Sequence, residues 1–156
     1  MKCAIYFSEI VIYNCKKRNI YLNKSKLMLL LYIIKKQYII DYNKLMFDDQ
    51  IILYKYNLII PSILKYYSDT KYGYAIKNKT NKKILLISHY NETINYVLDT
   101  YGEYSSYELL DKIKKDPYFI DLIEKGYNDI NMYLKTHIKP YKNKKYIKGR
   151  KENGRI

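Results

Sequence analysis

The chain has 156 residues, 48 % of them hydrophobic, and a formal net charge of +14 at pH 7. This length suits a single domain with its own core, and the apolar content excludes disorder throughout the chain. The longest apolar run is shorter than the about 18 residues that span a membrane, and the start of the chain lacks a signal-peptide pattern. We therefore expect a soluble cytoplasmic protein.

The positive charge has two competing explanations. Lysines that replace phosphate counterions, together with the 22 tyrosines, are typical of nucleic-acid binders. An AT-rich genome would enrich Lys, Ile, Asn and Tyr without any selection for a partner. Because net charge describes solubility and non-specific binding, it decides nothing about the fold.

The first predicted helix covers residues 4–17. Ala4, Phe7, Val11 and Cys15 recur at steps of three and four residues, whereas Glu9, Asn14, Lys16 and Lys17 occupy the other positions of the helical wheel. We expect an amphipathic helix with these four polar residues outside the apolar stripe. We also place Cys3 and Cys15 in it as ordinary buried or half-buried thiols, about 18 Å apart and beyond disulfide reach.

The second predicted helix, residues 22–40, is the expected centre of the fold. Asn23 is a suitable N-cap, and Leu22 and Leu27 have the spacing of a hydrophobic staple. Residues 27–34 are all apolar and cover every side of a helix for about two turns. Such a helix has no solvent face, so other elements must surround it.

A small β-hairpin is predicted next, with strands at Leu45–Phe47 and Ile51–Lys55 joined by a turn at Asp48–Gln50. Pro61 then suits the first position of a new helix.

The second half of the chain reads as an exposed connection followed by short helices. Residues 68–83 are polar, and the apolar run 84–87 fits either a strand or a lead-in. Further helices are expected at 94–101, stopped by Gly102; from the capping box Ser105–Glu108 to Asp116-Pro117; at 118–125; and from the cap Asp129 to Pro140. The predicted fold class is mainly α (α+β), a compact bundle of about six helices around a central buried helix with one small β-hairpin.

The composition divides the chain into a helical domain, residues 1–139, and a basic tail, residues 140–156, which we expect to be flexible. Residues 135–156 hold nine Lys or Arg against one Glu, a net +8 of the total +14. The candidate nucleic-acid contacts in the tail are Lys142, Lys144, Lys145, Lys148, Arg150 and Lys151. The alternative is a solvated tail without a partner.

No catalytic or metal-binding pattern stands out in the sequence. His89 and His137 have no metal-ligand partner at a suitable spacing, and the five glycines form no phosphate-binding motif. The adjacent Asp48 and Asp49 are typical of a turn. We therefore expect a protein that is not an enzyme, with neither a metal nor a cofactor.

Two segments carry a resemblance to a known family. The first runs from Leu22 to Tyr32 and continues through Leu45–Ile51 and Tyr54–Pro61; the second is Tyr101–Leu109. In order and spacing they resemble the Panacea antitoxin domain, the SocA-like family often labelled phage-associated. The residues that match its pattern are Lys26, Leu27, Leu30, Leu31, Tyr32, Phe47, Asp48, Tyr54, Lys55, Tyr56, Pro61, Tyr101, Gly102, Ser105, Glu108 and Leu109.

The chain departs from the family pattern at two places. Family members usually have a polar pair where this chain has Met28-Leu29, and glycine-proline where it has Asn57-Leu58. Asn57 can adopt the left-handed conformation of a glycine, so we expect the turn to be kept. A diverged copy in a virus or mobile element, acting in the host cytoplasm, fits these departures.

The resemblance implies a toxin-antitoxin system. The protein would be an antitoxin that neutralises a cognate toxin by stoichiometric binding, or an adaptor that delivers the toxin to a protease. Two alternatives stay open: a viral or phage counter-defence protein that binds a host protein complex, and a nucleic-acid-binding accessory protein that uses the basic tail.

Overall fold

The computed structural model describes residues 2–55, 57–80 and 88–138. Within these residues it is mostly helical, with a single two-stranded sheet. The helices are α1 (Ala4–Lys17), α2 (Lys24–Tyr42), α3 (Pro61–Tyr66), α4 (Ser88–Tyr101), α5 (Ser106–Lys114), α6 (Pro117–Glu124) and α7 (Ile130–His137). The predicted class, a mainly α bundle with one small hairpin, is confirmed. The basic tail lies outside the described residues.

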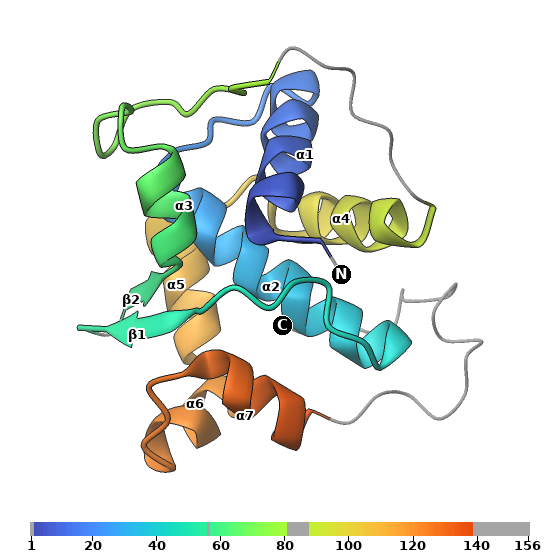
Figure 1. The fold of residues 1–156 in the computed structure, drawn as a ribbon, viewed down its shortest axis with the longest axis vertical. Helices are drawn as coiled ribbons and strands as arrows, with labels where there is room; N and C mark the ends of the chain where they lie inside the picture. The colour runs from blue at the N-terminus through green and yellow to red at the C-terminus, as the bar shows by residue number, and fades with distance from the viewer. Residues whose placement is uncertain (1, 56, 81–87, 139–156) are drawn as a thin grey trace.

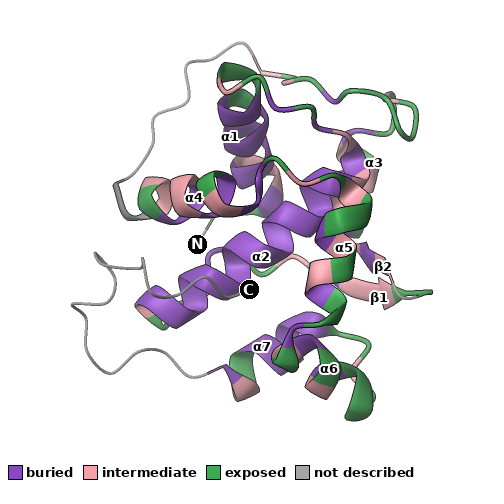
Figure 2. Cartoon of the chain, turned by 180° about the vertical axis from the view of Figure 1, so that it is seen from behind, coloured by how far each residue is buried: buried purple, intermediate pink, exposed green. Residues whose placement is uncertain are grey.

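Helix α2 is the centre of the molecule, as predicted. It begins after Asn23, whose side chain accepts a hydrogen bond from the backbone N–H of Lys26, and every residue from Lys26 to Asp41 is buried. Helices α1, α3, α4 and α5 and strand β2 pack against it. Figure 1 shows α2 crossing the middle of the fold, and Figure 2 shows it buried along almost its whole length.

The hairpin prediction placed the strands wrongly. Strands β1 (Ile52–Tyr54) and β2 (Asn57–Ile59) pair antiparallel, with Leu53 opposite Leu58. Lys55 has a positive φ of 48°, whereas Asn57 lies in the strand, so the turn is not built on Asn57 as expected. On its other edge β1 meets the segment before α7, where the N–H of Leu53 donates to the carbonyl of Asn128.

The pair Asp48-Asp49 is therefore no hairpin turn. The Asp49 carboxylate accepts hydrogen bonds from the backbone N–H of Ala4 at 2.8 Å and from the hydroxyl of Ser62 at 2.7 Å. It supplies α1 with the cap that Cys3 does not provide, and it ties the start of α1 to α3. The carbonyls of Asp48 and Asp49 accept from the side-chain amide of Asn131.

Helix α1 buries two polar residues that were expected outside its apolar stripe. Glu9 accepts hydrogen bonds from the hydroxyl of Tyr67 and from the backbone N–H groups of Lys79 and Thr80. Asn14 donates to the carbonyl of Ile10, one turn earlier in α1. Both side chains tolerate burial because they have partners there.

The cysteine prediction holds for one residue only. Cys15 is buried in α1, but Cys3 precedes the helix and is exposed. Burial raises the pKa of the Cys15 thiol to about 11. The thiol is therefore protonated at neutral pH and unreactive.

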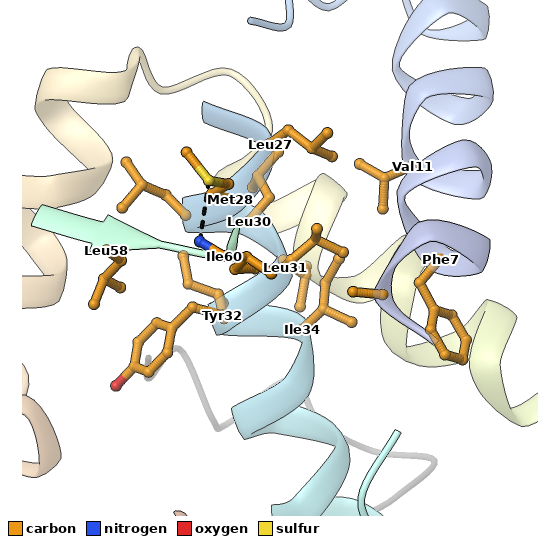
Figure 3. Close-up of a cluster of buried hydrophobic side chains, with 14 of the residues drawn as sticks. Phe7, Val11, Leu27, Met28, Leu30, Leu31, Tyr32, Ile34, Leu58 and Ile60 are labelled. Carbon is orange, nitrogen blue, oxygen red and sulfur yellow. Dashed lines mark hydrogen bonds between the residues drawn. The ribbon is translucent and has the colours of Figure 1, made fainter. Parts of the chain in front are cut away.

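The core cluster around α2 is drawn in Figure 3. Phe7 and Val11 of α1 face it from one side, and Leu58 and Ile60 approach from the hairpin. The backbone N–H of Ile60 donates to the sulfur of Met28 at 3.2 Å, shown as the dashed line. The sulfur of Met28 thus provides the acceptor for a backbone N–H just after the hairpin.

Two buried lysines on α2 bind the C-terminal helices. Lys35 Nζ donates to the side-chain oxygen of Asn131 on α7 and lies 4.7 Å from the centroid of the Phe47 ring. Lys36 Nζ lies 2.8 Å from the carboxylate of Asp116, which also caps α6. Desolvation lowers the pKa of Lys35 from 10.5 to about 8, while nearby aspartates partly oppose the shift.

Lys35 gives the first testable prediction. Because its pKa is lower in the folded than in the unfolded chain, the unfolded state holds the extra proton between the folded pKa of about 8 and the unfolded 10.5. Lys35 should therefore make the protein more stable as the pH rises through that window. Relative to Lys35→Met, the free energy of unfolding of the wild type should increase by about 1 to 2 kcal/mol between about pH 7.5 and 9.5.

Urea unfolding of both proteins at the two pH values measures this difference, and the titration of tyrosines, which the two proteins share, cancels in the comparison. The exposed Lys114, replaced by Met, is the matched control and should show no such trend. An unchanged difference between the wild type and Lys35→Met would contradict the buried, desolvated environment of Lys35.

Candidate functional site

A pocket of about 470 Å³ lies where the start of α2 meets the junction between α4 and α5. It is lined by the turn after α1, by Lys26 on α2, and by the segment 102–108. The two segments for which the sequence led us to expect a Panacea-like pattern both contribute to it, the first through Lys26 and the second through Gly102, Ser105 and Glu108. We call it the Lys26 pocket.

One wall of the pocket is the turn that ends α1. Asn19 adopts a left-handed conformation with φ 57°, and the backbone N–H of Ile20 donates to the carbonyl of Cys15 at 2.8 Å. This arrangement closes the helix and turns the chain towards Asn23, the cap of α2. Ile20 and Tyr21 thereby reach the pocket.

Lys26 joins the two resembling segments directly. Its side chain is on the first turn of α2, is only 5 % exposed, and donates from Nζ to the carbonyl oxygen of Gly102 at 2.6 Å. Desolvation lowers the pKa of Lys26, whereas Cys15, Glu103 and Glu108 act in the opposite direction. This contact spans 76 positions of the chain and connects α2 to the end of α4.

Gly102 is required by close packing. A Cβ at this position would lie 2.5 Å from the carbonyl oxygen of Leu98 and 2.9 Å from Cδ1 of Ile20. The Leu98 carbonyl also accepts the Gly102 N–H at 2.9 Å, an i to i−4 hydrogen bond that continues the pattern of α4. Helix α4 ends just before Gly102, as predicted, but Gly102 does not adopt the left-handed conformation of a typical C-terminal glycine. Its missing side chain instead lets the α1–α2 turn approach the end of α4.

The predicted capping box opens α5. The Ser105 hydroxyl accepts from the N–H of Glu108, and the Glu108 carboxylate accepts from the N–H of Ser105. These hydrogen bonds lower the pKa of Glu108. The hydroxyl of Ser106 donates to the side-chain oxygen of Asn23 at 3.2 Å, so the beginnings of α2 and α5 are bonded to each other.

Three tyrosines, Tyr21, Tyr104 and Tyr107, line the pocket. Tyr107 is 82 % exposed and Tyr21 is 57 % exposed. The hydroxyl of Tyr21 donates to the carbonyl of Gly73, and the ammonium of Lys112 lies 4.5 Å from the centroid of the Tyr104 ring. The lining therefore combines charged side chains, those of Lys26, Glu103 and Glu108, with exposed tyrosines, which we call the aromatic rim.

The remaining matched residues divide into two groups. Buried positions that build the core are Leu27, Leu30, Leu31, Tyr32, Phe47, Tyr101 and Leu109. Exposed positions away from the Lys26 pocket are Asp48, Tyr54, Lys55 and Pro61, and the Asp48 carboxylate pairs with Lys135 at 3.3 Å. Tyr56 and the six basic residues of the tail lie outside the described residues.

The turn after α1 is a part of the pocket that we did not predict from the sequence. The available signal was Asn19, because asparagine is common in the left-handed conformation at the position after a helix C-cap, which is Arg18 here. Within residues 2–55, 57–80 and 88–138, no group of His, Cys, Asp and Glu side chains has a metal-binding arrangement. No helix in this part of the chain has the length and hydropathy of a membrane span.

Comparisons with protein-family models, with curated proteins and with solved structures find no match to this chain. The candidate site therefore rests on its own geometry.

The testable prediction for this site concerns Gly102. Gly102→Ala should lower the free energy of unfolding by about 1 to 3 kcal/mol, because the new methyl group has to displace backbone. Chemical denaturation measures the loss. The adjacent exposed residue provides the control, since Glu103→Ala should change stability by less than about 0.5 kcal/mol. Equal effects of the two substitutions would rule out the close approach at Gly102.

Proposed function

We propose that this protein is a non-enzymatic binding protein that neutralises a partner protein by stoichiometric binding, as an antitoxin does for its toxin. The observation that carries the proposal is the meeting of both resembling segments at one pocket, where Lys26 bonds to Gly102. Segments so far apart in sequence, joined at a concave surface site, fit a binding role.

The rim of the pocket supports a protein partner. Tyrosine provides a large, rigid contact area with a polar end, and residues of this type dominate the binding energy of many protein interfaces. Tyr107 and Tyr21 lie exposed around a pocket that can accept a side chain of the partner. The rigid frame of helix ends reduces the entropy lost on binding.

Co-expression with a neighbouring open reading frame tests this function. We expect the neighbouring product to be toxic alone and tolerated together with this protein. Tyr107→Ala should weaken the complex by about thirtyfold, the effect of losing an interface hot spot, and should restore toxicity. Tyr13, an exposed tyrosine on α1 that does not line the pocket, is the control, and Tyr13→Ala should preserve neutralisation.

The amount of toxin in the co-expressing cells separates the two modes of action. Direct neutralisation leaves the toxin level unchanged, whereas a proteolytic adaptor lowers it. The antitoxin proposal requires a neighbouring product that is toxic when expressed alone and tolerated when expressed with this protein. If none is found, the proposal fails and the counter-defence alternative gains support.

Nucleic-acid binding through residues 140–156 is the second candidate function, favoured by the excess of Lys and Arg in that segment. A chain that ends at Pro140 distinguishes it from the first. Protein binding through the Lys26 pocket predicts that neutralisation survives this truncation, whereas a tail-dependent function predicts that it is lost.

A further inference from the structure

The ammonium group of Lys26 has more hydrogen-bond donors than it uses within the fold. It carries three N–H groups, and the carbonyl of Gly102 accepts one of them at 2.6 Å. For the other two, no acceptor is present among residues 2–55, 57–80 and 88–138, although Lys26 is only 5 % exposed. A buried charge whose N–H groups lack acceptors is unfavourable. A hydrogen-bond acceptor from another molecule that entered the pocket would therefore bind favourably to Lys26.

The backbone reinforces the positive charge of the pocket. Helices α2 and α5 both begin at its wall, and their N-caps, Asn23 and Ser105, line it. The N–H groups in the first turn of a helix have no acceptor within the helix, and the helix dipole adds partial positive charge at this end. In α5 the N–H of Glu108 is capped by Ser105, which leaves those of Ser106 and Tyr107.

The acidic residues around the pocket restrict which anion fits. Glu103 and Glu108 both line it, so it tolerates a single negative charge at Lys26 better than a chain of phosphates. The tyrosine rim favours a protein surface, and the net charge of +14 favours an acidic one.

We propose that the Lys26 pocket receives a glutamate or aspartate side chain of the partner protein, whose carboxylate accepts hydrogen bonds from Lys26 Nζ at the beginnings of α2 and α5. The proposal rests on the proposed function and names the chemical group that the pocket recognises.

The test titrates the full-length protein with N-acetyl-glutamate N-methylamide and follows backbone and lysine signals by NMR. We expect saturable shifts at Lys26, Gly102 and Ser106, and none there with the neutral N-acetyl-glutamine N-methylamide. Lys26→Met should weaken binding by about tenfold or more, the effect of removing a charged hydrogen-bond donor. Shifts that do not saturate, that the glutamine compound also produces, or that survive in Lys26→Met would overturn the proposal.

A second variant keeps the test decisive if Lys26→Met does not fold. Glu103 is exposed, so Glu103→Gln should fold and should tighten glutamate binding by about two- to fivefold, because it removes a competing negative charge. Glu124 at the end of α6 is the control, and Glu124→Gln should leave the affinity unchanged. Equal affinities for wild type and Glu103→Gln would contradict the assigned pocket.

Inorganic phosphate is the competing probe. If phosphate shifts the same signals at lower concentration than the glutamate compound, the pocket recognises phosphate groups and the acidic-protein partner is wrong. Failure of this titration, with neutralisation intact in co-expression, removes only the carboxylate assignment. Successful titration without neutralisation removes the antitoxin function.

Discussion

The burial of α2 on all sides is the constraint on which the rest of the structure depends. An apolar helix enclosed by α1, α3, α4 and α5 leaves its polar side chains without water, so each of them must find a partner inside the protein. Lys35 bonds to Asn131 and Lys36 pairs with Asp116 at 2.8 Å. Asp116 and Asn131 lie at the beginnings of α6 and α7. The partners that the buried lysines of α2 require therefore also hold these two C-terminal helices against α2.

The same constraint places the candidate site. Lys26 lies in the first turn of α2, and within residues 2–55, 57–80 and 88–138 its ammonium group donates a hydrogen bond to the carbonyl of Gly102. The absence of a side chain at Gly102 lets α4, the α1–α2 turn and α2 meet closely enough for this hydrogen bond. A pocket built from helix ends that are bonded to one another is pre-organised, which suits binding.

The helices were predicted from local sequence signals. The features that were predicted wrongly, the hairpin and the exposure of Glu9, depend on contacts between distant parts of the chain. Asn23, Ser105 and Asp129 cap helices within three residues of themselves, so their roles can be read from the sequence. The hairpin could not be placed this way, because Asn128 and Asn131, which lie far along the chain, bond to β1 and to the segment before it. The burial of Glu9 likewise depends on the loop at Lys79 and Thr80. The motif residues were found in sequence, but the pocket needed the contact between Lys26 and Gly102.

Native-state hydrogen exchange tests the central claim, that α2 is the enclosed core of the molecule, most directly. The amide protons of α2 from residue 28 to residue 40 should exchange only through global unfolding, and more slowly than those of α6 and α7, because opening α2 requires its neighbours to separate. Exchange of the α2 amides at rates equal to or faster than those of α6 and α7 would contradict the account.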